Sequence, residues 1–167
     1  MKGWVLVLLA AGAAWWYFVG GRQLSEEQVR AFYRDMEIAT LNRQPDDLCA
    51  LLAPDFQSAG TFEVGQQRRS QVQDKAQACE AYRDLYDRWD KLGEKMGGTL
   101  QLDANHAIHS VTISADKKSA TVDISHSLDV AGSIMNMRSH TTDTLIRRQG
   151  RVLLLRSEGT GSVGGGS

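Results

Sequence analysis

Residues 100–130 read LQLDANHAIHSVTISADKKSATVDISHSLDV, and this stretch decides the fold. From Thr99 onward apolar residues recur at every second position, which is the period of a β-strand with one buried face. Four strands are predicted, over residues 100–114, 120–130, 138–148 and 151–158. The connections between them are short, so we expect the strands to form an antiparallel meander.

Upstream of the meander the apolar period becomes that of a helix. Residues 25–28 form a capping box that predicts a helix start, and a second box over residues 70–73 predicts the start of a long helix. A short helix is expected after Pro45, and residues 55–64 are expected to be extended. Helices followed by a meander predict an α+β domain in which the N-terminal helices pack on the sheet.

The order of these elements resembles the nuclear-transport-factor-2-like superfamily, including its SnoaL-like group. The resemblance rests on a capped helix containing VRAFY (residues 29–33), on LLAPDF (residues 51–56) leading into an extended segment, and on the long hairpins of the meander. It covers residues 24–158 and implies a cystatin-like cone, in which a curved antiparallel sheet of four to six strands wraps around a helix and encloses a pocket.

Members of this superfamily differ in what they do. Some are isomerases, cyclases or dehydratases, and many only bind ligands or partners, often as dimers. None of the catalytic motifs of the superfamily matches this sequence residue by residue, so the resemblance implies a fold and a pocket rather than an activity.

The N-terminal segment predicts where the domain resides. Residues 4–20 read WVLVLLAAGAAWWYFVG and contain no charge, and at about 1.5 Å per residue they just span a bilayer core. Trp4 at one end and Trp15 and Trp16 at the other are the expected membrane-interface residues. The segment is therefore expected to be one transmembrane helix, anchored in a bacterial inner membrane with the domain in the periplasm.

This segment also sets the expected domain organisation. Residues 1–22 are the anchor, residues 23–158 the exported domain, and residues 159–167 a flexible tail because they are rich in glycine and serine. The alternative for the first part is a signal peptide cleaved after Gly21, which would leave the same domain secreted or periplasmic.

Cys49 and Cys79 are the two cysteines of the chain. In an exported protein an even pair predicts one disulfide bond. The alternative is two small buried thiols, because Cys79 falls on the apolar face of the long predicted helix.

Charge and motifs exclude several classes of function. The chain has 19 Lys and Arg against 20 Asp and Glu, a net charge of −1, so it lacks the positive surface of a nucleic-acid-binding protein. The sequence contains no P-loop, no G-x-S-x-G and no H-E-x-x-H motif. No cofactor and no metal are predicted.

The histidines of the meander are the candidate chemical groups. If the first hairpin has a four-residue loop, His109 and His126 share the apolar face and oppose each other at about 5 Å between Cβ atoms. His140 is expected on the same interior face, which places Asp143 and Leu145 on the outside. The three histidines could then line a pocket and act as a general base or bind a metal.

The alternative is that these histidines are exposed or already satisfied polar residues. This interpretation is the preferred one, because any β-bulge changes the face on which a strand histidine lies. His106 lies three residues from His109, which puts the two on opposite faces and argues against a shared metal site.

Three aromatic residues of the long helix are the candidate ligand contacts. Tyr82, Tyr86 and Trp89 recur at helical spacing. The alternative is burial in the core, which is the preferred interpretation because helical spacing already explains these positions.

Two functions follow from these expectations. The first is a membrane-tethered, non-catalytic domain that binds an envelope protein or a small apolar ligand. In this first function the domain forms a homodimer. The expected dimer surface is an outer sheet face that carries Leu145, Val152 and Leu154. The alternative is a small-molecule isomerase, dehydratase or cyclase with a histidine-lined pocket and His126 as general base.

Overall fold

The computed structural model describes residues 23–132 and 134–165. The expected anchor, with Trp4, Trp15 and Trp16, lies outside these residues. Within them, no helix has both the length and the apolar character needed to cross a bilayer.

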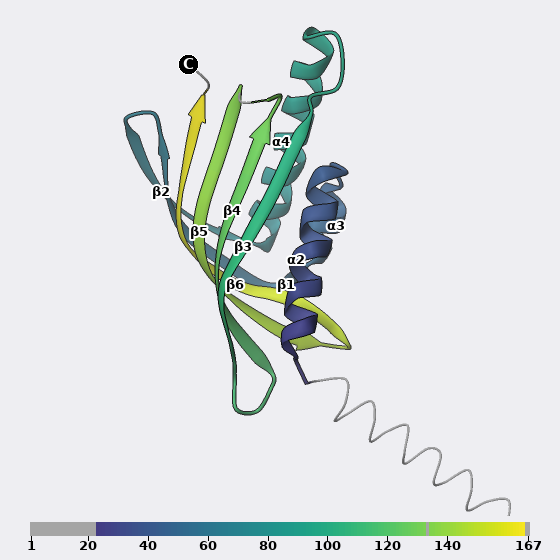
Figure 1. Ribbon diagram of the computed structural model, residues 1–167, viewed down its shortest axis with the longest axis vertical. Coiled ribbons are helices and arrows are strands. Elements are labelled where there is room, and N and C mark those ends of the chain that lie inside the picture. The colour runs from purple at the N-terminus through teal and green to yellow at the C-terminus, as the bar shows by residue number, and fades with distance from the viewer. Residues whose placement is uncertain (1–22, 133, 166–167) are drawn as a thin grey trace, which may run out of the picture.

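A six-stranded sheet with helices on one face makes up the described domain (Figure 1). The helices are α2 (Glu26–Leu41), α3 (Pro45–Ala50) and α4 (Lys75–Lys95). The strands are β1 (Leu52–Val64), β2 (Gln67–Asp74), β3 (Leu102–Ile113), β4 (Ser119–Val130), β5 (Met135–Arg148) and β6 (Arg151–Gly165). The α+β class and the strand-rich second half agree with the sequence-based expectation.

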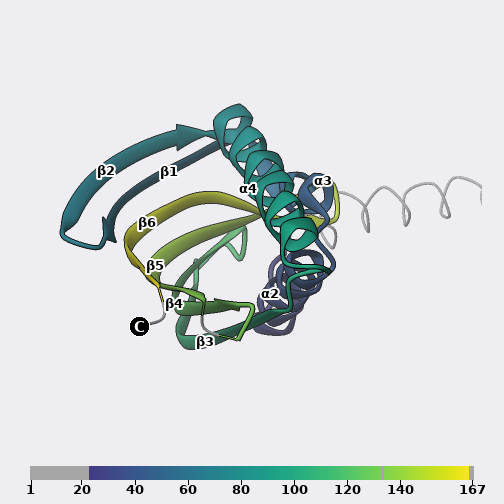
Figure 2. The ribbon, with the colours of Figure 1, turned by 90° about the horizontal axis from the view of Figure 1, so that it is seen from above.

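The strand order in the sheet is β2-β1-β6-β5-β4-β3. Neighbouring strands are antiparallel except β1 and β6, which run parallel, so the sheet is mixed rather than wholly antiparallel. The sheet curls strongly, and α2 and α4 lie across its open side (Figure 2). Helix α2 packs on β3, and α4 packs on β1 and β2. The result is the expected cone with a helix-lined interior.

The first capping box is present and the second is not. Gln28 N donates to Ser25 Oγ and Ser25 N donates to Gln28 Oε1, which caps α2 as predicted. Residues 70–73 instead belong to β2, where they pair with β1. The long helix begins at Lys75 with a different box, in which the Asp74 carboxylate accepts from Gln77 N.

The glycine-rich segment after residue 158 is not a flexible tail. Residues 159–165 form the second half of β6 and pair with both β5 and β1. A Cβ at Gly159 would lie 2.1 Å from the carbonyl oxygen of His140, and one at Gly161 would lie 2.8 Å from the Phe62 ring. Glycine is required here because the neighbouring strand and ring approach the backbone closely.

The faces of β5 are the reverse of those expected. Leu145 is 0% exposed, Leu154 is 5% exposed and Val152 packs against the same core. These residues therefore offer no outer surface for a dimer. A bulge after Thr144 pairs Asp143 with Ser157, and not with the arginine that a regular ladder would place there.

A disulfide joins the short helix α3 to the long helix α4. Cys49 of α3 and Cys79 of α4 are bonded, with their Cα atoms 5.2 Å apart. This is the pairing that the sequence predicted. It fixes α3 against the helix that covers β1 and β2.

Candidate functional site

A cavity of about 300 Å³ lies between the helices and the inner face of the sheet. Its apolar walls come from Met36 of α2 and from Leu128, Met137 and Leu154 of the sheet. Its polar groups come from α2 and α4 on the helical side and from strands β3, β4, β5 and β6 on the side of the sheet. An apolar cavity with a few converging polar side chains is the usual form of a small-molecule site.

A buried hydrogen-bond chain forms one side of this cavity. Tyr33 Oη donates to Asp143 Oδ2 at 2.9 Å, and Ser157 Oγ donates to Asp143 Oδ1 at 2.7 Å. Asp143 is only 2% exposed. Burial, with a further contribution from the charge of Asp143, raises the pKa of Tyr33 far above its ordinary value, so the hydroxyl keeps its proton.

Two histidines face each other beside this chain. His106 of β3 and His126 of β4 are directly paired across the strands, and the ring centroid of Tyr33 lies 5.9 Å from each. Burial lowers the pKa of His126 below its ordinary value of 6.5, and the nearby His106 lowers it further while Asp143 opposes the shift. His126 is therefore a neutral imidazole at neutral pH.

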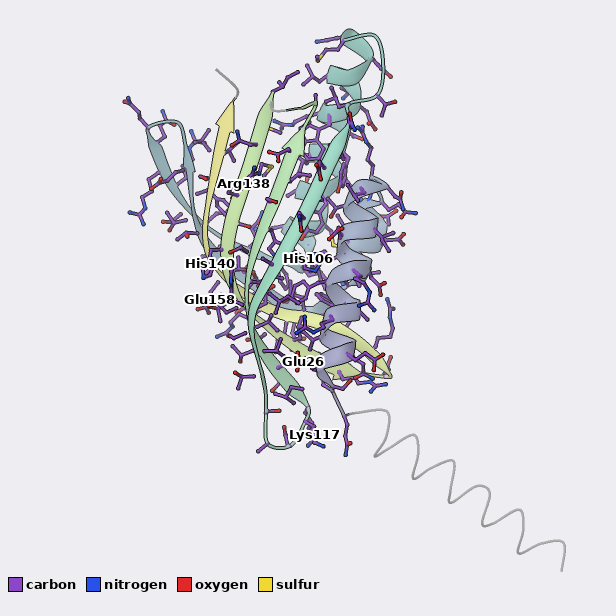
Figure 3. The ribbon with its side chains drawn as sticks, viewed as in Figure 1. Glu26, His106, Lys117, Arg138, His140 and Glu158 are labelled. Atoms are coloured by element: carbon purple, nitrogen blue, oxygen red, sulfur yellow. A yellow bond between two sulfur atoms is a disulfide. The ribbon has the colours of Figure 1, made fainter. Side chains whose placement is uncertain are left out.

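His106 is held by a carboxylate from α2. Its Nδ1 lies 2.6 Å from Oε2 of Glu37, and Glu37 follows Tyr33 by one helical turn. The carboxylate favours a proton on Nδ1, which leaves Nε2 of the neutral ring as a proton acceptor. Figure 3 shows His106 on the side of the sheet that faces α2. A carboxylate that orients an imidazole is the usual arrangement of a general base.

The predicted group of His109, His126 and His140 does not share one face. A bulge between Ile108 and Ser110 resets the alternation of β3, so His109 points away from the cavity. His109 Nε2 and His140 Nδ1 both contact Ser125 Oγ, at 2.8 Å and 3.0 Å, on the outer face. The expectation that His109 opposes His126 is wrong, and His106 holds that place.

Among the polar residues of the cavity, Tyr33, Glu37, His106 and Asp143 were not predicted as site residues. The i, i+4 spacing of Tyr33 and Glu37 on α2 places them on one helix face and could have linked them. Asp143 alternates with Leu145, which could have marked it as inward-facing.

Only Tyr82 of the three candidate aromatic residues lines the cavity. Burial raises its pKa to about 12. Tyr86 and Trp89 belong to a separate core cluster, with their ring centroids 5.4 Å apart, and Tyr86 Oη donates to the carbonyl of Thr40. Their helical spacing reflects core packing, which was the alternative interpretation.

Comparison with protein-family models found no match for the sequence, and comparison with curated proteins found none either. Solved structures, in contrast, are similar over most of the chain. A putative scytalone dehydratase from Novosphingobium aromaticivorans matches with a TM-score of 0.60 and 10% identity, over 84% of this chain and 87% of its own.

Two further structures have the same architecture. An NTF-2-like protein of unknown function from Silicibacter pomeroyi has a TM-score of 0.53 and 12% identity, covering 83% of this chain and 94% of its own. A ketosteroid isomerase-like protein from Erwinia carotovora atroseptica has a TM-score of 0.51 and 14% identity, covering 84% and 98%. The domain therefore has the nuclear-transport-factor-2-like, or cystatin-like, fold that the sequence resemblance implied. At these identities the similarity defines the fold alone.

Proposed function

We propose that the inner cavity binds a small, largely apolar molecule and that His106, oriented by Glu37, transfers a proton on it, as in an isomerase, dehydratase or cyclase. The observation that carries this proposal is the 2.6 Å contact between His106 and Glu37 inside the cavity. The two side chains are only partly buried, at 19% and 33% exposure, and both line the cavity, so a ligand there can contact the imidazole.

The chemistry assigns a role to each polar group. A proton leaves a carbon of the ligand for Nε2 of His106, and the carboxylate of Glu37 stabilises the resulting imidazolium. The proton then returns to another atom of the ligand, which completes an isomerisation. Neutral His126 is the hydrogen-bonding partner for a polar atom of the ligand, and the Tyr33–Asp143 hydrogen bond holds that end of the cavity rigid.

Two proteins of similar fold support an acid–base reaction, but they do not define a substrate. The putative scytalone dehydratase and the ketosteroid isomerase-like protein are described by names that imply proton-transfer chemistry on small molecules. The apolar walls of the cavity fit a ligand with a hydrocarbon body and one or two oxygens.

Deuterium exchange tests the proposal directly. The full-length protein is incubated in D2O with a panel of alicyclic and aryl ketones, and exchange at the carbon next to the carbonyl is followed by NMR. We expect catalysed exchange that falls about 100-fold or more in Glu37→Gln and in His106→Gln. Glu27→Gln is the matched control, because Glu27 is an exposed carboxylate on the same helix.

Two results would contradict the proposal. Ketones that bind without exchange would leave a non-catalytic binding domain, the first function expected from the sequence. Exchange that is equal in Glu37→Gln and the wild type would remove the His106–Glu37 pair from the chemistry.

We further propose that residues 1–22 hold this domain at the outer face of a bacterial inner membrane. The proposal is supported by the uncharged run over residues 4–20 and by the disulfide, which is typical of oxidising compartments. Expression of the full chain should give a membrane-bound protein whose domain is cleaved by protease added to spheroplasts. A chain beginning at Gln23 should be absent from the membrane fraction, and equal amounts there would contradict the anchor.

A further inference from the structure

A second cluster of titratable side chains lies on the outer face of the sheet. His109 of β3, Asp123 of β4 and His140 of β5 come from three adjacent strands, and we call them the outer triad. One possible ligand atom from each lies within 4.8 Å of the other two. Figure 3 shows His140 near Glu158 on the side of the sheet turned away from the helices. The sheet itself separates the outer triad from the inner cavity.

The β3 bulge creates this cluster. Strand alternation from Val111, which pairs with Val122 on the inner face, would place His109 inside. The extra residue at the bulge turns His109 outward, onto the face where Ser110 pairs with Asp123. Bulges that redirect one side chain are common beside functional sites.

Contacts among the side chains hold the outer triad together. Ser125 Oγ lies between the two rings, 2.8 Å from His109 Nε2 and 3.0 Å from His140 Nδ1. The other nitrogen of His140, Nε2, lies 3.3 Å from Asp123 Oδ1. The two ring centroids are 5.5 Å apart. The three groups therefore converge on one small region.

One atom of this cluster lacks a hydrogen bond. Asp123 Oδ1 is shielded from solvent and accepts no hydrogen bond from residues 23–132 or 134–165. Among the described residues, His140 is the only basic side chain within 4.0 Å of this carboxylate. A shielded carboxylate oxygen without a donor is costly and calls for an explanation. A cation bound to this oxygen would explain why it lacks a hydrogen-bond donor.

We propose that His109, Asp123 and His140 bind a divalent transition-metal ion, with zinc as the reference case. Imidazole nitrogen and carboxylate oxygen are both ordinary zinc ligands. Three protein ligands leave a fourth position for water or a solute molecule. His140 also lines a shallow groove of about 550 Å³, together with Ser125, Arg138 and Thr160, so the cluster is open to solvent on that side.

The same side chains include a serine, a histidine and an aspartate, but they do not form a nucleophilic triad. Ser125 lies in the middle of β4, which pairs with β3 on one side and β5 on the other. The backbone N–H groups around it are committed to these strands, so no pair of donors is free to stabilise an oxyanion.

Zinc titration of the full-length protein, purified without a histidine tag, tests the proposal. Calorimetry should show one zinc ion per chain for the wild type. His140→Ala and Asp123→Asn should each weaken binding by more than about 10- to 100-fold, the loss typical when even the outer shell of a metal site is altered. Zinc should also raise the denaturation midpoint of the wild type and not that of His140→Ala.

His126→Ala is the matched control, because this histidine lies on the same strand as Asp123 and faces the opposite way. It should keep the wild-type affinity for zinc. Since the side chains of Asp123 and His140 are 39% and 56% exposed, their substitution leaves the core intact, and circular dichroism verifies this. Absence of stoichiometric binding, or equal loss in His126→Ala and His140→Ala, would overturn the proposal.

Discussion

Tyr33 on α2 donates a 2.9 Å hydrogen bond to Asp143 on β5, across 110 residues of sequence. Both side chains are almost completely buried, at 1% and 2% exposure. This bond joins the helix to the inner face of the sheet at the point where the cavity begins. It is both a structural tie and a wall of the site.

Removing the Tyr33 hydroxyl tests this tie. Tyr33→Phe leaves one oxygen of a buried carboxylate without its donor, and we expect the free energy of unfolding to fall by about 1–3 kcal/mol. Urea denaturation measures the change. In a double-mutant cycle with Asp143→Leu, the two losses should not add, because each variant removes the same bond. Additive losses would show that the two residues are not coupled.

Stability should depend on pH through His126. Burial lowers the pKa of His126 in the folded protein below 6.5, its ordinary value, so the unfolded chain binds more protons in that window. The contribution to stability is complete above pH 6.5 and is lost as pH falls below 6.5 toward the folded pKa. Urea midpoints of the wild type and His126→Gln should diverge as pH rises through this range. Parallel pH profiles would contradict the assignment.

The Cys49–Cys79 disulfide closes a loop with a sequence separation of 30. Loop-closure entropy predicts that removing it costs about 3–4 kcal/mol at 25 °C. Denaturant unfolding of Cys49→Ser/Cys79→Ser against the oxidised wild type measures this cost. Reduction of the wild type should give a similar loss, and a midpoint unchanged by either treatment would exclude a stabilising disulfide.

Glycine at position 159 is required by the approach of β5. Gly159→Ala would place a methyl group 2.1 Å from the carbonyl oxygen of His140, so β6 or β5 must shift. We expect a loss of about 1–3 kcal/mol, as for other overpacked positions. Gly98→Ala is the control, because no atom lies within 4 Å of its added Cβ. Equal stability of the two variants would mean that residues 159–165 are not held in the sheet.

The strands and helices could largely be predicted from the sequence because their periods are clear. The four strands of the meander, the Ser25 cap and the Cys49–Cys79 pair all follow from local pattern. The start of α4 could not be located, because Ser70 to Gln73 and Asp74 to Gln77 both carry capping chemistry. The helix begins at the second of these boxes because residues 67–74 pair with β1 as strand β2.

The site residues could not be predicted from the sequence, because their positions also depend on how the strands pair. A single extra residue at a bulge reverses the face of every residue that follows, and two bulges occur, in β3 and in the β5–β6 pair. The β3 bulge makes His106, and not His109, the partner of His126. Asp143 lies inside because it shares a face of β5 with the buried Leu145. Gly159 and Gly161 resembled a linker because glycine signals both flexibility and close backbone approach.

The parallel pairing of β1 with β6 also constrains how the chain folds. Strand β6 is the last of the six to be synthesised, yet it lies between β1 and β5 near the middle of the sheet. Before β6 is in place, β1 pairs only with β2, and β5 is an unpaired edge strand of the meander. The cone therefore closes in one late step that depends on contacts between distant segments. Such long-range pairing is slow and leaves unpaired edges exposed.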